Sequence, residues 1–272
     1  MKTLLVLAVI LLSIMLSLGC VSKPTTKPDQ VVVSAVVSPL KVVVMQDRTG
    51  SVDTTRTPRI AAAEIDELIE IVKRRTGEIA FGFIDNDSNE SLVRLRITAP
   101  PVAPVEPDNE GNPYKVAERV AAYRKAKAAY DKEQTNWQND VDRRVETFKS
   151  TIQPMIEDKK RYGATDIIGG LTRADLFLSE SRPGSGMGQQ TNVIVLITDG
   201  LDNVRRTPEE IKSGATIVLV NSSHSKGVLS KYQTETFESI EAAFRFVAEL
   251  QGTTTSAANG AGPGSRMARS IR

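Results

Sequence analysis

Three runs of consecutive apolar residues constrain the fold of this chain most strongly. Residues 42–45, 193–197 and 216–220 are apolar almost throughout, and most of their residues are β-branched. A strand that faces water on one side alternates between apolar and polar positions, whereas a strand covered on both sides does not. Segments with helical periodicity separate these runs. The sequence therefore predicts a doubly wound, Rossmann-like α/β fold with a mostly parallel sheet.

Local signals predict the remaining elements. Residues 79–84 and 92–97 flank a polar turn, which is typical of an antiparallel hairpin at the edge of a sheet. We expect a helix that has Thr57 as N-cap and Pro58 in its first turn, and that ends at Gly77.

Three further segments complete the expected fold. Helices are predicted from Thr165 to about residue 179 and around residues 240–247. Short edge strands are expected at residues 31–37 and 234–237.

Residues 100–144 are predicted to be a long helical insertion into this fold. Residues 100–107 contain four prolines and should be extended. From about residue 114 to residue 160 the chain is charged and helix-forming, with Tyr123, Tyr130 and Trp137 in an apolar stripe. A straight helix of that length would measure roughly 70 Å at about 1.5 Å per residue. Because that exceeds the size of such a domain, we expect either a bend near residues 133–136 or a projecting arm.

The N-terminus has the features of a targeting segment. Lys2 precedes an apolar run at residues 4–18 that is too short for a good membrane span. The run ends in Gly19 and Cys20, which resembles the bacterial lipobox, although Ser17 stands where that pattern usually has Leu. The alternative is a stray buried cysteine.

The lipobox resemblance implies how the chain is processed and where it resides. We expect residues 1–19 to be a signal peptide, Cys20 to be lipidated, and residues 20–39 to include a polar tether. The predicted location is the bacterial cell envelope, facing the periplasm or the exterior. At the other end, residues 252–272 are small, polar and arginine-containing, and are expected to be disordered.

Composition excludes several classes of function. The 272 residues include 35 Lys and Arg against 33 Asp and Glu, so the charge balance gives no case for a nucleic-acid binder. With one cysteine and one histidine, the chain can form no intrachain disulfide and no multi-thiolate or histidine-rich metal site. The only histidine, His224, is expected to be a surface polar residue rather than a catalytic base.

Oxygen-bearing side chains gather at the predicted ends of two strands. Asp47, Thr49 and Ser51 follow the first strand at alternate positions, so their side chains should point to a common place. Asp199 follows residues 193–197, and Thr165 lies at a helix start. Strand ends of a parallel sheet open onto the ligand crevice, and such hard donors suit Mg²⁺, Mn²⁺ or Ca²⁺ rather than zinc. The alternative is that both aspartates only form turns.

This pattern resembles that of the von Willebrand factor A (vWA) domain and its metal-ion-dependent adhesion site. The family pattern is Asp-x-Ser-x-Ser with a distant Thr and a distant Asp, and Thr49 replaces the usual first Ser here. The resemblance covers residues 40–251 and implies direct binding of the ion by hydroxyls, with at least one Asp acting through water. A partner's Asp or Glu would then complete the coordination of the cation, for which Mg²⁺ is the first choice.

Three hypotheses of function follow. The first is a lipid-anchored, non-enzymatic module that binds a protein through a divalent cation and a partner carboxylate. The second is an envelope scaffold or assembly protein with a vestigial metal site, which interacts through its helical insertion. The third is a hydrolase that uses Asp47 and the ion. We expect no enzyme, because no general base or nucleophile accompanies the cluster.

Overall fold

The computed structural model describes residues 38–86, 88, 91–180, 190–204, 206–220 and 227–250. The predicted signal peptide, Cys20, most of the tether, the expected strand at residues 31–37, His224 and the C-terminal tail lie outside these residues. Within the described ranges, no helix combines the length and the apolar character that crossing a bilayer requires.

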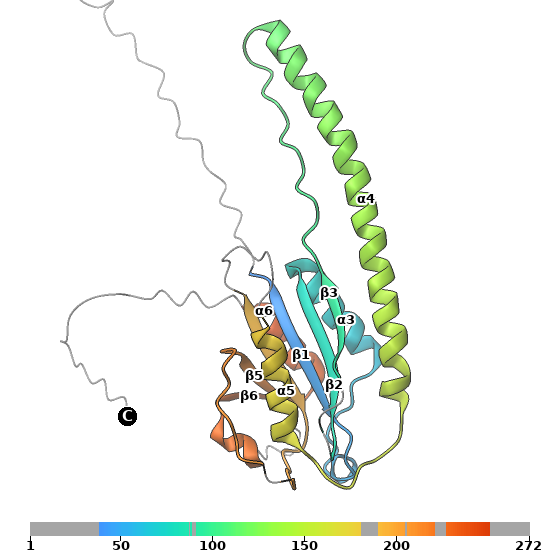
Figure 1. Ribbon diagram of the computed structural model, residues 1–272, viewed down its shortest axis with the longest axis vertical. Coiled ribbons are helices and arrows are strands. Elements are labelled where there is room, and N and C mark those ends of the chain that lie inside the picture. The colour runs from blue at the N-terminus through green and yellow to red at the C-terminus, as the bar shows by residue number, and fades with distance from the viewer. Residues whose placement is uncertain are drawn as a thin grey trace, which may run out of the picture. The chain divides into compact units, whose positions relative to one another are not determined.

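Six strands form one sheet in the order β3-β2-β1-β4-β5-β6 (Figure 1). The central strand β1 (Leu40–Asp47) pairs in parallel with β2 (Gly77–Ile84) and with β4 (Thr191–Ile197). Strands β5 (Thr216–Val220) and β6 (Thr234–Phe237) continue the parallel pairing, whereas β3 (Val93–Ile97) is antiparallel to β2. The predicted mostly parallel sheet with one antiparallel edge hairpin is confirmed.

Apolar residues cover both faces of the sheet. Val42 and Val44 of β1 pack in one cluster with α3 (Ala62–Arg75), α6 (Ile240–Glu249) and the last part of α4 (Pro113–Glu157). Val43 and Met45 pack in a second cluster with α5 (Ile167–Ser179) and the short 3-10 helix η1 (Gly227–Lys231). This double covering explains why the strands are apolar throughout.

Two helices begin later than the sequence predicts. Helix α3 begins at Ala62 and not near Thr57, because the backbone N–H of buried Ile60 donates to Gln46 Oε1 at 3.0 Å and holds the preceding segment in a loop. Helix α5 begins at Ile167, with the side chain of Asp166 as its N-cap. Thr165 therefore lies in the loop before the helix.

Gly77 occupies a position that only glycine can fill. Its φ is 142°, and a Cβ there would lie 1.8 Å from the carbonyl oxygen of Leu40. The preceding residue, Thr76, already has a positive φ of 57° as the chain leaves α3. Gly77 therefore allows β2 to start directly after α3 and in close contact with β1.

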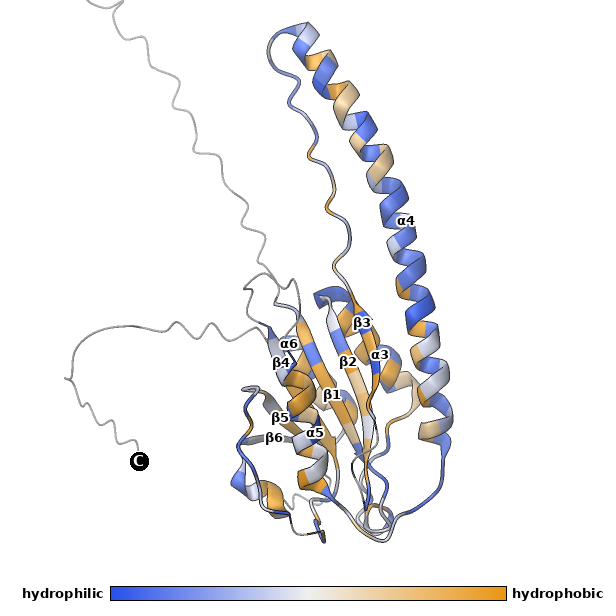
Figure 2. Ribbon diagram, viewed as in Figure 1, coloured by the Kyte–Doolittle hydropathy of each residue, from blue (hydrophilic) through white to orange (hydrophobic). Residues whose placement is uncertain are grey.

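Helix α4 is one helix of 45 residues, helical across residues 133–136, so no break divides it (Figure 1). Its last part contributes buried Val141, Phe148 and Ile152 to the core. The first part contributes no buried residue and is mostly hydrophilic (Figure 2).

Residues 98–112 run back along this first part of α4. Trp137 Nε1 donates to the Thr98 carbonyl at 3.1 Å, and an Arg119 amino group donates to the Glu110 carbonyl at 2.7 Å. Residues 98–137 therefore form a hairpin of one extended segment and one helix, which we call the arm. The boundary of the predicted insertion, residue 144, falls inside α4.

Candidate metal centre

Asp47, at the end of β1, and Thr49 and Ser51, which follow it, lie in contact, as their spacing predicts. The backbone N–H and the hydroxyl of Thr49 both donate to Asp47 Oδ1, at 2.8 Å and 2.6 Å. Thr49 Oγ1 lies 3.2 Å from Ser51 Oγ, at the start of the short helix α2 (Ser51–Thr54). One carboxylate and two hydroxyls therefore lie side by side at the carboxyl end of β1.

The end of β4 brings a second carboxylate to the same place. Parallel pairing of Gln46 with Ile197 sets Asp47 beside Thr198, whose hydroxyl donates to Asp47 Oδ2 at 2.7 Å. The next residue, Asp199, accepts the Leu201 N–H through Oδ1 at 3.0 Å and is close enough for its charge to act on Asp47.

The fifth predicted residue, Thr165, lies in the adjoining loop. Its backbone N–H donates to Asn203 Oδ1 at 2.7 Å, four residues after Asp199. The same loop pairs with the first one through a bridge between Thr49 and Tyr162. In the described part of the chain, no hydrogen bond joins the Thr165 hydroxyl to the other four side chains. The structure thus brings four predicted residues together and places Thr165 in a loop held against both of theirs.

The two carboxylates are buried without a cationic side chain. Asp47 is 2% exposed and Asp199 is fully buried, and neither forms an ion pair with a Lys or Arg that the structure describes. Burial raises the pKa of the Asp47 carboxyl from 3.8 to about 6, hydrogen bonds from Thr49 and Thr198 oppose this rise, and the charge of Asp199 adds to it. A buried cation would relieve this repulsion.

The donor set fits a hard divalent cation. The described residues contain no group of three or more His, Cys, Asp or Glu that could hold a metal, so hydroxyl oxygens would have to complete any site here. Asp47, Thr49, Ser51 and Asp199 supply such oxygens, and Thr165 is a further candidate. Neutral hydroxyls and few carboxylates leave a bound cation short of negative charge, which favours an additional anionic ligand.

Sequence reasoning missed a set of supporting contacts beside the site. The Arg48 guanidinium forms an ion pair with Asp85 at 3.0 Å and stacks over Phe83, at 3.8 Å from the ring centroid. These contacts join the loop after β1 to the end of β2. The sequence signal for these contacts was the alternation of side chains at the end of β1, which directs Arg48 away from Asp47. Thr198 could have been found from its place directly before Asp199.

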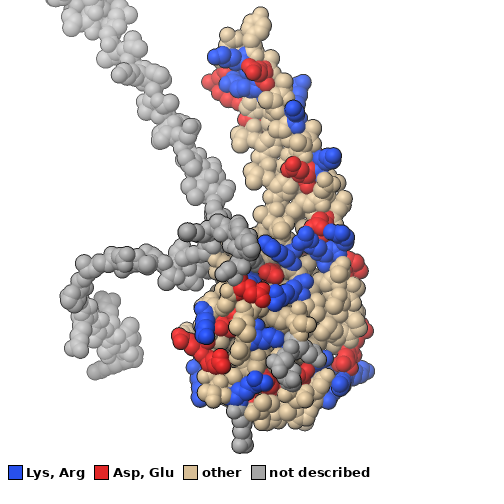
Figure 3. Space-filling view, viewed as in Figure 1, with Lys and Arg blue, Asp and Glu red and all other residues tan. Residues whose placement is uncertain are grey.

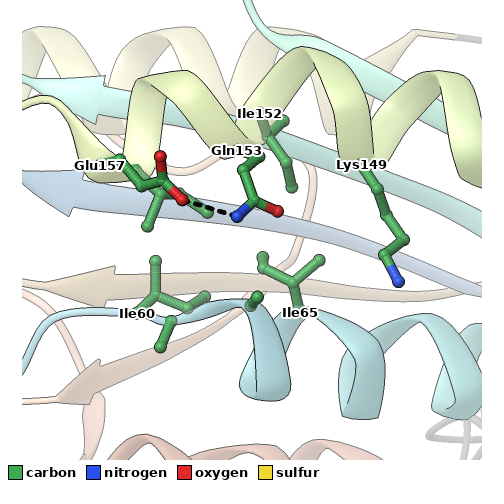
Figure 4. Close-up of a pocket in the computed structure, with 9 residues that line it drawn as sticks. Ile60, Ile65, Lys149, Ile152, Gln153 and Glu157 are labelled. Atoms are coloured by element: carbon green, nitrogen blue, oxygen red, sulfur yellow. Dashed lines mark hydrogen bonds between the residues drawn. The ribbon is translucent and has the colours of Figure 1, made fainter.

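A hollow of about 200 Å³ lies between the start of α3 and the end of α4 (Figure 4). Ile60, Ile65 and Ile152 give it an apolar lining, and Gln153 donates to Glu157 beside it. Lys149 lies at this hollow and forms an ion pair with Asp66. The hollow lacks the grouped oxygen donors of the site after β1, so we assign it no metal chemistry.

No protein-family model and no curated protein matches the chain. Solved structures of proximal thread matrix protein 1 from the mussel byssus are similar to it. One with a zinc-occupied MIDAS motif has a TM-score of 0.35 at 12% identity. A second has 0.35 at 14%, and another crystal form has 0.31 at 11%. Each match covers 78% of this chain and 46% of the mussel protein, so the chain spans under half of its length. At these scores, the fold and the site rest on the geometry described above.

Proposed function

We propose that the chain is a lipid-anchored, extracytoplasmic binding module that holds a protein partner through a divalent cation and a partner carboxylate. The observation that carries this proposal is the pair of buried carboxylates, Asp47 and Asp199, beside the hydroxyls of Thr49 and Ser51. Mg²⁺ is the cation expected first, with Mn²⁺ or Ca²⁺ as alternatives. No bond is made or broken in this function.

The charges beside the site support an acidic ligand. Asp53, two residues after Ser51, accepts hydrogen bonds from both Arg59 and Arg161, the latter at 3.0 Å. Hydrogen bonding from Arg161 lowers the pKa of the exposed Asp53 carboxyl. Two guanidinium groups against one carboxylate leave positive charge that attracts an incoming Asp or Glu.

Capture of a partner from envelope extract tests the cation requirement. The full chain should retain a partner in Mg²⁺ and lose it in EDTA, and Asp47→Asn and Asp199→Asn should fail to retain it. Asp142→Asn, an exposed substitution on α4, is the matched control and should behave as the wild type. Retention that ignores both EDTA and the two site variants would contradict the proposal.

The anchor is tested separately. Metabolic palmitate labelling should mark the wild type and not Cys20→Ser, and the variant should move to the soluble fraction. Equal labelling of both proteins would contradict lipidation at Cys20.

The scaffold hypothesis keeps one observation in its favour. The arm offers a long, mostly exposed surface in which Val102 and Val105 are each 90% exposed. Under that hypothesis, removing the arm abolishes partner capture and removing the cation does not.

A further inference from the structure

A groove of about 430 Å³ lies between the edge strand β3 and helix α4. Four arginines line the groove, namely Arg94, Arg96, Arg143 and Arg144. Thr147 and Phe148 also line it, whereas no Asp or Glu does. Figure 3 shows Lys and Arg side chains gathered where α4 passes the sheet. The groove lies away from the oxygen cluster after β1.

The described acidic side chains engage these arginines only in part. Glu180 accepts two hydrogen bonds from Arg94, at 2.7 Å and 2.9 Å. Arg143 and Arg144 share the single carboxylate of Asp140, at 2.5 Å and 2.7 Å.

Arg96 forms no hydrogen bond or ion pair with any residue that the structure describes, although Glu78 is its cross-strand neighbour. Four guanidinium groups thus meet three nearby carboxylates, none of which lines the groove. Guanidinium groups bind carboxylates through paired hydrogen bonds, so this lining is suited to an anionic ligand.

The outer edge of β3 favours a ligand in extended conformation. Strand β3 ends the sheet, and no described strand pairs with its outer side. Arg94 and Arg96 lie two residues apart on one face of β3, about 6.8 Å along the strand, where Arg94 also stacks over Phe177 of α5. Buried Leu95 lies on the other face, in the same apolar cluster as Phe148 of α4. An extended peptide has the same two-residue repeat and brings N–H and C=O groups to pair with the edge.

We propose that this groove binds an acidic peptide segment in extended conformation, which adds to the edge of β3 and places carboxylates against Arg96. Alternating acidic and apolar residues put carboxylates on the face of Arg94 and Arg96 and apolar side chains on the face of Leu95 and Phe148. The groove is concave, which fits a peptide better than a flat anionic membrane. This site is independent of the proposed cation and should bind in EDTA.

Fluorescence anisotropy with the full chain in non-ionic detergent tests the proposal. The probe is a labelled eight-residue peptide of alternating Glu and Val, measured in EDTA. We expect binding that weakens with salt, and a loss of affinity of about tenfold for Arg96→Gln, because this variant removes a charge-assisted hydrogen bond. Arg124→Gln, on the arm portion of α4, is the matched control and should bind as the wild type.

Three competitors distinguish strand addition to β3 from other modes of binding to the groove. A peptide of alternating Glu and Pro has the same charge but lacks half of the backbone donors, and should bind at least tenfold more weakly. Equal binding of that peptide, or equal competition by tripolyphosphate or by vesicles with anionic lipid, would overturn strand addition.

Affinity that survives Arg96→Gln would overturn the site. So would a wild type that binds no peptide while Arg96→Gln self-associates, since the arginine would then only protect the edge. Thermal melts of the variants, whose substituted side chains are exposed, check that each is folded.

Discussion

The two parts of α4 belong to one helix but lie in different environments. Val141, Phe148 and Ile152 are buried in the core with the sheet and α3, whereas the portion up to Trp137 has no fully buried side chain. The apolar spacing of threes, fours and sevens continues through both. A heptad stripe therefore indicates a helix with one covered side, but it does not indicate how thick the covering layer is.

The covering layer of the arm is a single extended segment. Pro101, Pro104 and Pro107 are half buried at a three-residue period, as are Tyr123 and Tyr130 at a seven-residue period. Three residues of a polyproline II helix advance about 9 Å, and seven residues of an α-helix advance about 10.5 Å. The two repeats nearly match, so half-buried prolines and half-buried tyrosines recur at similar intervals along the two segments of the arm.

The largest difference between the two parts should come from large-to-small substitutions. Phe148→Ala should lower the free energy of unfolding by about 3–5 kcal/mol, because it removes a ring that is 2% exposed and leaves a cavity. Tyr123→Ala in the arm should cost under about 1 kcal/mol. Urea unfolding followed by circular dichroism measures both. Similar costs would show that the arm is packed as tightly as the core.

The core should also respond to pH in a way that the arm cannot. Without metal, the folded-state pKa of Asp47 is about 6 against 3.8 for an ordinary Asp. Because the folded-state pKa is the higher one, the contribution of Asp47 to stability is greatest below about pH 4 and falls as the pH rises through 6, by up to about 3 kcal/mol. Urea unfolding in EDTA at several pH values measures this slope.

Asp47→Asn should remove most of that slope, whereas Tyr123→Ala in the arm should leave it unchanged. A pH dependence that is the same in the wild type and in Asp47→Asn would contradict the assignment to Asp47.

Metal binding should stabilise the core by a smaller amount. The donors come from separate loops, so the unfolded chain has no assembled site, and a cation at a hundredfold excess over its Kd should add about 2.7 kcal/mol. Thermal melts in Mg²⁺ or Mn²⁺ should exceed those in EDTA. Asp47→Ala and Asp199→Ala should abolish the difference, and Thr49→Ser should keep it. A wild-type melt that ignores every divalent cation would indicate a vestigial site.

The smallest effect is expected from a deletion that takes out most of the arm and the next three residues of α4. Removing residues 108–140 should leave a cooperative melt and an unchanged metal response. The deletion is geometrically feasible because Thr98 and Trp137 are already joined by a 3.1 Å hydrogen bond, so residues 99–107 can close the gap. Calorimetry in Mg²⁺ and in EDTA measures both properties. Loss of the cooperative transition would show that the core depends on the arm.

Much of the candidate site could be predicted because its donors follow regular elements. Alternation after β1 places Asp47 and Thr49 on one side in any extended segment, and parallel strands bring their carboxyl ends to one edge. Thr165 was harder to place, because the start of α5 depends on the side chains of Asp166 and Asp202, which accept hydrogen bonds from its first N–H groups. A local pattern does not indicate which of several neighbouring polar residues will cap a helix.

The sequence by itself determined the alternation of strands and helices, the antiparallel edge hairpin and the grouping of oxygen donors, because these depend on periodicity within short segments. Only the tertiary structure decided where α3 begins, since Gln46 binds the Ile60 N–H across 14 residues of sequence. It also decided that α4 continues unbroken into the core, and that Arg94, Arg96, Arg143 and Arg144 line one groove. Each of these depends on contacts between residues far apart in the chain, whose energies no local pattern records.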